Sequence, residues 1–294
     1  MNPVQFTQTL INGLMLGGTF ALVGLGFSIV WGIMNIINIT HGEFIMLGAY
    51  ATYFLYTSFG IDPFLTIPLS MAILFLIGYA LQRGVINWVI RASLLVKFLI
   101  TFGLSILLEN VAVQLFSGDY RSVTTPYSGA GIEFGDVKIA YVRLAALLIS
   151  ILLVYLFHLF LTRTRTGNAI RATGMDLDAA RLTGVKIAPT FALTYALSAA
   201  LAGGAGSLIS MTFPITPDMG GGYTVYAFLI CILGGLGSVP GALLGGVVLA
   251  LLQVFAGFFA PGFKDAIAFS ILVLVLIVRP EGLIGKAFYS GSEQ

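Results

Sequence analysis

Four polar side chains lie close together in an otherwise apolar part of the sequence: Asn38, Thr40, His41 and Glu43. They fall between the apolar runs LMLGGTFALVGLGFSIVWGI and MLGAYATYFLY. A glutamate and a histidine can bind a polar solute or pair with each other, while asparagine and threonine can accept hydrogen bonds from the free N–H groups at a helix start. The cluster therefore predicts either a segment that lines a solute pathway or a polar knot that caps broken helices and contacts no solute.

Catalytic chemistry is not predicted for this chain. A protease site needs a nucleophile, a base and an oxyanion-binding group within reach of one another, and neither His41 nor His158 can be paired by sequence with a serine. The segment GAGSLIS around Ser207 and Ser210 is typical of a small-residue helix face. The chain has no G-x-x-x-x-G-K-[ST] phosphate loop, and its one cysteine, Cys231, offers neither a disulfide nor a metal cluster. We expect no catalytic residue, no bound metal or cofactor and no nucleic-acid partner.

Membrane-spanning helices must position the polar cluster. Of the 294 residues, 58% are hydrophobic and 9% are charged, whereas soluble domains have roughly 25% charged residues. Apolar runs long enough to cross a bilayer lie at about 9–34, 63–81, 98–116, 142–162, 188–212 and 242–259, with shorter runs near 44–58, 223–234 and 266–279. The runs are continuous and do not alternate as barrel strands do. We predict an all-α, polytopic transmembrane bundle of about eight to nine spans, forming a single domain over 1–294.

Two of these helices are expected to be interrupted. The segment 35–43 has no lysine or arginine, and irregular backbone at membrane depth is tolerated only inside protein or along a wet cavity. The second break, ILGGLGSVPGALLGG at 232–246, contains Pro240 and several glycines. Interrupted segments in both halves of a chain indicate a transport pathway. The pairs Gly13 with Gly17 and Gly241 with Gly245 are expected to be close helix packing.

Basic residues predict the orientation. Lysine and arginine concentrate in 82–97, in 163–186 and in the C-terminal tail, and such clusters mark the cytoplasmic side. These segments, the C-terminus included, are therefore expected inside, while 117–141 and 213–222 are expected outside. The N-terminus lies outside if 35–43 crosses the membrane fully, and inside if it only dips into it.

The loop at about 163–187 predicts a two-turn amphipathic helix. Its supporting residues are two possible N-caps, a helix-favouring run and a terminating glycine: Asp176 or Asp178, Ala179, Ala180, Arg181, Leu182 and Gly184. A helix this short is marginal alone, so the protein's own face or a partner's groove must support it. The alternative is a basic anchor on anionic membrane lipid.

Four blocks in register resemble the permease subunits of ATP-binding cassette importers for branched-chain amino acids, in particular the shorter of the two paired permeases. They are HGEFIMLGAY at 41–50, GNAIRATGMDLDAARLTGV at 167–185, GGLGSVPGALLGG at 234–246 and VLVLIVRPEGLIGK at 273–286. The resemblance implies a multi-pass protein of the bacterial inner membrane that works with a second homologous permease, two ATP-binding subunits and an external solute-binding protein. ATP would be used by those partner subunits and not by this chain.

The resemblance also assigns the loop at 163–187 as the coupling helix that sits in a cleft of the ATPase. Its expected contacts are Arg171, Asp176, Asp178, Ala179, Ala180, Arg181, Leu182 and Gly184. Two features depart from the family. The loop RGVINWVIRASLLVK at 83–97 lacks an Arg-Pro-x-Arg arrangement. Glu109 places a carboxyl group in an apolar span, where it is a functional candidate by default or is hydrogen-bonded to a neighbouring helix.

The expected function is translocation of branched-chain or related amino acids; similar permeases serve urea, short amides and other amino acids. The residues expected to line the pathway are Asn38, His41, Gly42, Glu43, Gly48 and Glu109, with Gly42 and Gly48 leaving room for the solute. The alternative is a secondary transporter or uniporter for a small polar solute, which would use the same broken helices without an ATPase. A structural membrane scaffold, with no dependence on solute, is the third class.

Overall fold

The computed structural model describes residues 1–278 and 282–284. Arg279 and Lys286, which predicted an internal C-terminus, lie outside the described residues. The first half of the chain forms helices α1 (Pro3–Met34), α2 (His41–Phe59), α3 (Pro63–Leu81), α4 (Asn87–Val89) and α5 (Leu94–Phe116), with a π-helical turn at Gln82–Ile86. The second half forms α6 (Tyr141–Arg163), α7 (Arg165–Met175), α8 (Leu177–Leu182), α9 (Ile187–Ser210), α10 (Met219–Gly234), α11 (Val239–Phe259) and α12 (Lys264–Val278), with a 3₁₀ turn at Pro261–Phe263.

The prediction of a polytopic helical membrane bundle is confirmed. Within the described residues, six helical segments are long and apolar enough to cross a membrane: Pro3–Met34, Pro63–Val89, Leu94–Phe116, Tyr141–Arg163, Ile187–Ser210 and Val239–Phe259. Helices α2, α10 and α12 fall short of that length or apolarity. A total of eight to nine spans therefore stays a prediction, which depends on how these three helices sit in the bilayer.

Helices α1 and α9 form the centre of the bundle. Their most apolar segments are each 89% buried, whereas that of α5 is 11% buried. Close helix contacts depend on glycine, as predicted: a Cβ added at Gly17 would lie 2.9 Å from the Cα of Val247 on α11. A Cβ at Gly245 would lie 2.4 Å from the carbonyl oxygen of Ile230 on α10. The bundle thus has a tightly packed centre and a loosely attached span, α5, at its edge.

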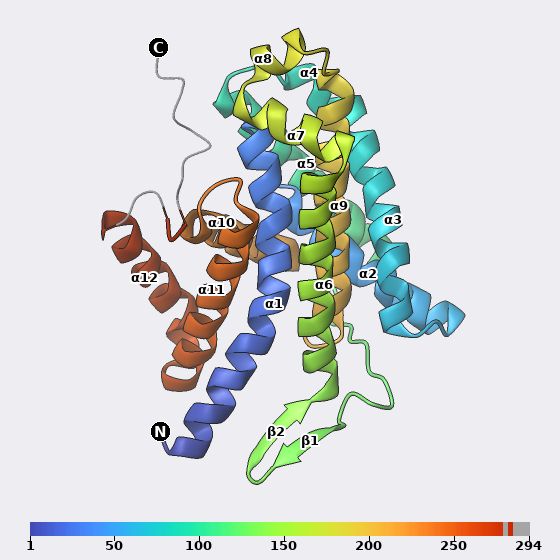
Figure 1. Ribbon diagram of the computed structural model, residues 1–294. Helices are drawn as coiled ribbons and strands as arrows, with labels where there is room; N and C mark the ends of the chain where they lie inside the picture. The colour runs from blue at the N-terminus through green and yellow to red at the C-terminus, as the bar shows by residue number, and fades with distance from the viewer. Residues whose placement is uncertain (279–281, 285–294) are drawn as a thin grey trace.

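The bundle has two distinct ends (Figure 1). Helices α4, α7 and α8 lie at one end, called here the α8 end. The N-terminus lies at the opposite end beside a β-hairpin, in which β1 (Gly131–Phe134) pairs antiparallel with β2 (Val137–Ala140). We call this the hairpin end. Helix α1 runs the whole way between the two.

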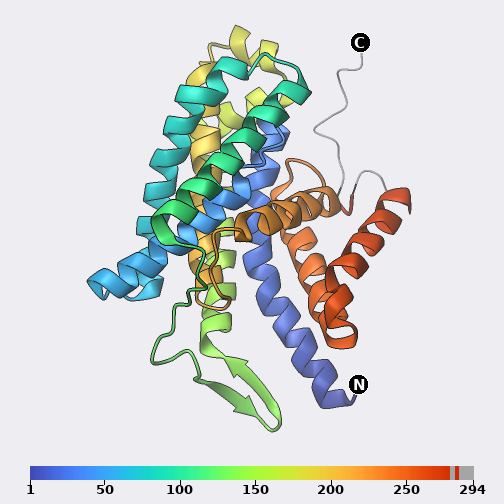
Figure 2. The ribbon, with the colours of Figure 1, turned by 180° about the vertical axis from the view of Figure 1, so that it is seen from behind.

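Both predicted interruptions are present. Helix α1 ends at Met34, where Asn35 has a φ of +50°, and α2 starts only at His41. Helix α10 ends at Gly234, and α11 restarts at Val239 with Pro240 in its first turn and the Ser238 hydroxyl accepting from Gly241 N at 3.1 Å. Figure 2 shows α10 lying across α1 instead of along it. The breaks therefore produce two short helices, α2 and α10, that meet inside the bundle.

Candidate functional site

The segment between α1 and α2 turns back into the bundle. His41 Nε2 lies 2.9 Å from the carbonyl oxygen of Val23, which precedes the end of α1 at Met34 by eleven residues, about 16 Å of helix. Residues 35–40 therefore run back along α1, and α2 begins at the depth of Val23. The polar side chains of this segment are enclosed: Asn38, His41 and Glu43 are 1%, 0% and 1% exposed.

Asn38, Thr40 and His41 hydrogen-bond within the segment or to α1 and α9, although the Asn38 amide nitrogen has no hydrogen-bond partner among the described residues. The Thr40 hydroxyl hydrogen-bonds Asn38 Oδ1, to which Tyr195 of α9 also donates at 3.0 Å, and the two hydroxyls lie 2.8 Å apart. His41 Nδ1 lies 3.4 Å from Ser198 Oγ, also on α9. This part of the segment forms an enclosed hydrogen-bonded network, as the polar-knot alternative expects, but the network does not include the predicted helix cap. Neither Tyr195 nor Ser198 was predicted, because only the folded chain brings α9 beside the break.

Thr224 of α10, which the sequence did not single out, supplies the hydrogen bond expected of a cap. Its Oγ1 accepts from the N–H of Gly42 at 2.9 Å and donates to the carbonyl oxygen of Ile39 at 3.0 Å. Thr40 occupies the N-cap position of α2 but makes no capping hydrogen bond through its side chain. The expectation that Asn38 and Thr40 cap the helix is therefore wrong, and the start of α2 is tied to the start of α10.

The expectation that Gly42 and Gly48 leave room for solute is also wrong. A Cβ at Gly42 would lie 1.8 Å from the carbonyl oxygen of Gly220, and a Cβ at Gly48 would lie 2.5 Å from that of Gly203. The space beside Gly42 is filled by the backbone of α10, and the space beside Gly48 is filled by the backbone of α9. Their role is to allow close backbone approach.

Glu43 lies where α2, α5 and α10 meet. Its Oε1 accepts a hydrogen bond from Ser105 of α5 at 2.9 Å. Its Oε2 has no hydrogen-bond partner among the residues that the structure describes, and a Cβ added at Gly220 would lie only 2.3 Å from that oxygen. The carboxyl group thus sits at the first turns of both α2 and α10, where the free N–H groups of a helix favour oxygen acceptors. A buried polar atom without a partner is uncommon, so Oε2 is available to a further donor.

A row of polar residues on α5 faces this junction. Lys97, Thr101, Ser105 and Glu109 recur every four residues and so share one side of the helix. Thr101 donates to the carbonyl oxygen of Ile37 in the break at 2.9 Å. Glu109, partly buried, lies one turn beyond Ser105 and therefore close to Glu43. We call these four residues the α5 stripe.

The α5 stripe leads to a cavity at the α8 end. The cavity has a volume of about 750 Å³ and lies between the end of α1, the segment around α4, the start of α5, helices α7 and α8 and the start of α9. Lys97 is part of its lining, together with Arg91 and Arg181. The loop at 83–97, which departs from the family pattern, thus forms one of its walls.

At the hairpin end the space between α2 and α5 is closed. The backbones of Arg121 and Ile215 pair as an antiparallel bridge, which joins the two loops at that end. The Arg121 guanidinium donates to the carbonyl oxygen of Phe116 at 2.6 Å and lies 5.2 Å from the ring centroid of Tyr53. Tyr50 stacks on Phe116 with centroids 4.4 Å apart. The polar junction is therefore closed toward the hairpin end, while the Lys97 end of the α5 stripe lines the cavity at the α8 end.

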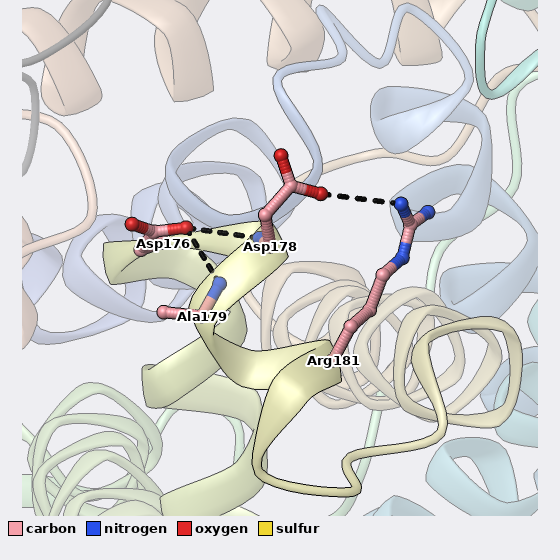
Figure 3. Close-up of polar contacts among 4 residues, drawn as sticks. All are labelled: Asp176, Asp178, Ala179 and Arg181. Carbon is pink, nitrogen blue, oxygen red and sulfur yellow. Dashed lines mark hydrogen bonds and ion pairs between the residues drawn. The ribbon is translucent and has the colours of Figure 1, made fainter.

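The loop at 163–187 folds into two helices, of which α7 was not predicted. Thr164 caps α7 by accepting from Gly167 N at 2.9 Å. Figure 3 shows that Asp176, and not Asp178, caps α8: its Oδ1 accepts from the N–H groups of Asp178 and Ala179, both at 2.9 Å. Gly184 ends the segment with a φ of +88°, as predicted.

The expected contact face of α8 needs correction. Ala180 is 3% exposed and packs inward, whereas Leu182 is 90% exposed, and Ala179 is exposed as well. The three residues therefore do not form one outward surface. Arg181 points away from the helix and pairs with Asp178 at 3.3 Å, and Arg171 donates to Asn168 Oδ1 at 2.7 Å.

Nearly the whole chain is similar to one group of known proteins, the permeases of branched-chain amino acid transport systems. Residues 9–276 match the family model described as "Branched-chain amino acid transport system / permease component". The chain is 33% identical to the high-affinity branched-chain amino acid transport system permease protein BraD of Pseudomonas aeruginosa and 31% identical to the LivH protein of Escherichia coli K12, in both cases over 96% of each chain. It is 25% identical to the LivM permease of Salmonella typhimurium, over 90% of this chain and 67% of that protein. No solved structure matches.

Proposed function

The chain belongs to the permease components of branched-chain amino acid transport systems, and we propose that it forms one half of the translocation unit of an ATP-driven importer. Its relatives over nearly the whole length are permease subunits, so the chain itself is a transport subunit and not an enzyme. A second, homologous permease completes the unit, two ATP-binding subunits drive it, and an external binding protein delivers a branched-chain or related amino acid.

The α8 end is assigned to the cytoplasm and the hairpin end to the outside. Basic side chains gather at the α8 end: Arg83, Arg91, Arg163, Arg165 and Arg171 all belong to segments there. With this orientation the N-terminus lies outside, one of the two expected alternatives, although residues 35–40 return only to the depth of Val23 and α2 continues from there. The polar junction is then closed toward the outside, and the cavity lined by Lys97 lies on the cytoplasmic side.

The substrate path is assigned to the space beside the α5 stripe. The observation that carries this assignment is the free Oε2 of Glu43, buried at the meeting point of three helices. An amino acid carries an ammonium group with three N–H donors, and a carboxyl oxygen without a partner is a suitable acceptor. Glu109 supplies a second carboxyl group nearby, while Asn38 and His41 hold the break in position.

Interrupted helices favour this assignment on general grounds. In transporters, substrate sites form where discontinuous helices meet near the bilayer centre, with helix starts and unwound backbone supplying polar groups. Helices α2 and α10 start at such a meeting point, and Thr224, in the second turn of α10, hydrogen-bonds the first turn of α2 and the end of the break. The exposed apolar surface of α5 faces either lipid or the second permease, and its weak attachment to the bundle suits a span that moves.

Coupling to ATP hydrolysis is assigned to α7 and α8. Among the exposed residues of this pair are Arg171, Asp178, Ala179, Arg181 and Leu182. Asp176 and Gly184 fix the start and the end of α8, and Ala180 anchors it on the bundle. A side chain such as Leu182, apolar and 90% exposed, gains most from burial in a partner's cleft.

The test is reconstitution of the chain with the second permease, the ATPases and the binding protein encoded with it. We expect leucine uptake that requires ATP and the binding protein, together with ATP hydrolysis that the loaded binding protein stimulates. Uptake by the permease without ATPase subunits would instead establish the uniporter. A scaffold would give neither solute uptake nor stimulated hydrolysis.

A further inference from the structure

The cavity at the α8 end has the chemistry of a binding site. Its basic lining residues are Arg91, Lys97 and Arg181, and no aspartate or glutamate lines it. Arg181 has an ion pair with Asp178, but Arg91 and Lys97 have no carboxylate partner within 4.0 Å in the part of the chain that the structure describes. Basic side chains gathered in a cavity without acidic neighbours favour an anionic group on the ligand.

The rest of the lining indicates what else the ligand carries. Apolar side chains from α1, α8 and α9 also line the cavity, among them Ile33, Leu177 and Phe191. The amide side chains of Asn35 and Asn87 also line the cavity and provide oxygen acceptors for an ammonium group. A ligand with a carboxylate, an ammonium group and an aliphatic side chain matches all three kinds of lining. The volume of about 750 Å³ falls within the range usual for small-molecule sites, about 300 to 1,000 Å³.

This cavity and the junction at Glu43 are two separate candidate binding sites. Lys97 precedes Ser105 by eight residues on α5, which corresponds to about 12 Å along the helix. One amino acid cannot contact both places at once. A ligand in the cavity would, however, touch Leu177 and Arg181 of α8, the helix assigned to coupling.

We propose that the basic cavity binds free aliphatic amino acids from the cytoplasm through their carboxylate, and that occupancy restrains α8. The inference rests on the proposed orientation and substrate class. Its consequence is that the accumulated product slows the ATPase cycle, because a ligand held between α5 and α8 opposes movement of one against the other.

The first test measures binding to the complete permease–ATPase complex in nanodiscs of neutral phosphatidylcholine, without the binding protein. Tritiated leucine is the probe. We expect saturable binding that weakens about tenfold in Arg91→Gln and in Lys97→Gln, since each removes one charge-assisted hydrogen bond. Lys138→Gln is the matched control, because Lys138 lies on the hairpin at the opposite end, and it should bind leucine as the unchanged protein does.

Ligand analogues and lipids decide which chemistry is recognised. Norvaline should displace leucine, whereas leucinamide, which lacks the carboxylate, should not. Equal displacement by leucinamide, or leucine binding that neither substitution weakens, overturns the inference. Displacement of leucine by added phosphatidylglycerol would identify the cavity as a lipid headgroup site and would also overturn it.

A second measurement follows ATP hydrolysis at rising leucine concentrations, with each variant compared with its own rate in the absence of leucine. We expect inhibition in the unchanged complex, and a half-inhibitory concentration about tenfold higher in Arg91→Gln. Normal ATP-driven uptake with no inhibition of ATP hydrolysis by leucine would overturn this inference but leave the proposed function standing. Leucine binding that depends on Arg91, in a permease that shows neither uptake nor an associated ATPase, would overturn the proposed function but leave the binding site standing.

Discussion

Ser105 Oγ lies 2.9 Å from Glu43 Oε1 and so connects the least buried span, α5, to the buried start of α2. Few other contacts hold α5 against the break, among them the hydrogen bond from Thr101 to Ile37. The hydroxyl on the less buried helix donates to the carboxyl group on the buried one, and an ammonium group is a donor to the same kind of acceptor.

Glu43→Gln is expected to reduce leucine uptake about tenfold to hundredfold, the equivalent of roughly 1.4 to 2.8 kcal/mol. The amide keeps one acceptor for Ser105 but replaces the free carboxyl oxygen that would accept from the ammonium group. Initial rates of binding-protein-dependent uptake in proteoliposomes measure the effect. Glu133→Gln, on the exposed hairpin, is the control and should transport normally. Unchanged uptake by Glu43→Gln would show that the junction is a structural knot.

Gly42→Ala should destabilise the protein instead of blocking a channel. The added methyl carbon would meet the Gly220 carbonyl oxygen at 1.8 Å, so α2 and α10 must separate, and overpacking of this kind costs about 1 to 3 kcal/mol or more. Gly221→Ala, beside the same contact, has no atom within 4 Å of its added Cβ. Apparent melting temperatures in detergent should therefore fall for the first variant and not for the second. Equal melting temperatures would contradict the close approach of the two helices.

Local chemistry made the breaks predictable. The polar residues after Met34 and the Gly/Pro run around Pro240 each disfavour a continuous helix, and both interruptions fall within the predicted ranges. The crossing of α10 over α1 was not predictable, because it depends on contacts between distant segments. For the same reason the sequence could not tell that Gly42 faces the backbone of Gly220 and not a solute. A glycine signals a need for space, but only the fold shows what occupies it.

Arg121→Ala should loosen the closure at the hairpin end. The change removes the hydrogen bond to Phe116 and the contacts with the rings of Tyr53 and Phe54, and cation–π contacts contribute about 0.5 to 2 kcal/mol each. Ala112, buried beneath this cluster, is replaced by cysteine as a reporter in a Cys231→Ala background. Labelling by an impermeant maleimide from outside should become several-fold faster in Arg121→Ala, while Lys138→Ala leaves it unchanged. No acceleration would mean that Arg121 does not control access.

Substitutions on the surface of α8 distinguish a helix that docks on an ATPase from one that anchors the permease on lipid. Leu182 is 90% exposed and Ala180 is 3% exposed, although they lie on the same short helix. Leu182→Ser should therefore leave the melting temperature unchanged but weaken binding of the ATPase, since burying a leucine contributes about 1.5 to 3 kcal/mol. Ala180→Leu should lower both the melting temperature and ATPase binding, because the larger side chain disturbs the packing of α8 against the bundle even without a partner.

The measurement is binding of purified ATPase subunits to the permease pair in nanodiscs, together with melting temperature and stimulated ATP hydrolysis. A variant with Arg171, Arg181 and Lys186 all changed to glutamine tests the lipid alternative, in which basic charge and not Leu182 would matter. If α8 docks in a cleft, Leu182→Ser loses binding and hydrolysis together in neutral lipid, where no anionic surface is present to hold a basic helix. Normal ATPase binding by Leu182→Ser, with loss only in the triple variant and only in anionic membranes, would refute the coupling role of α8 and leave it as a membrane anchor.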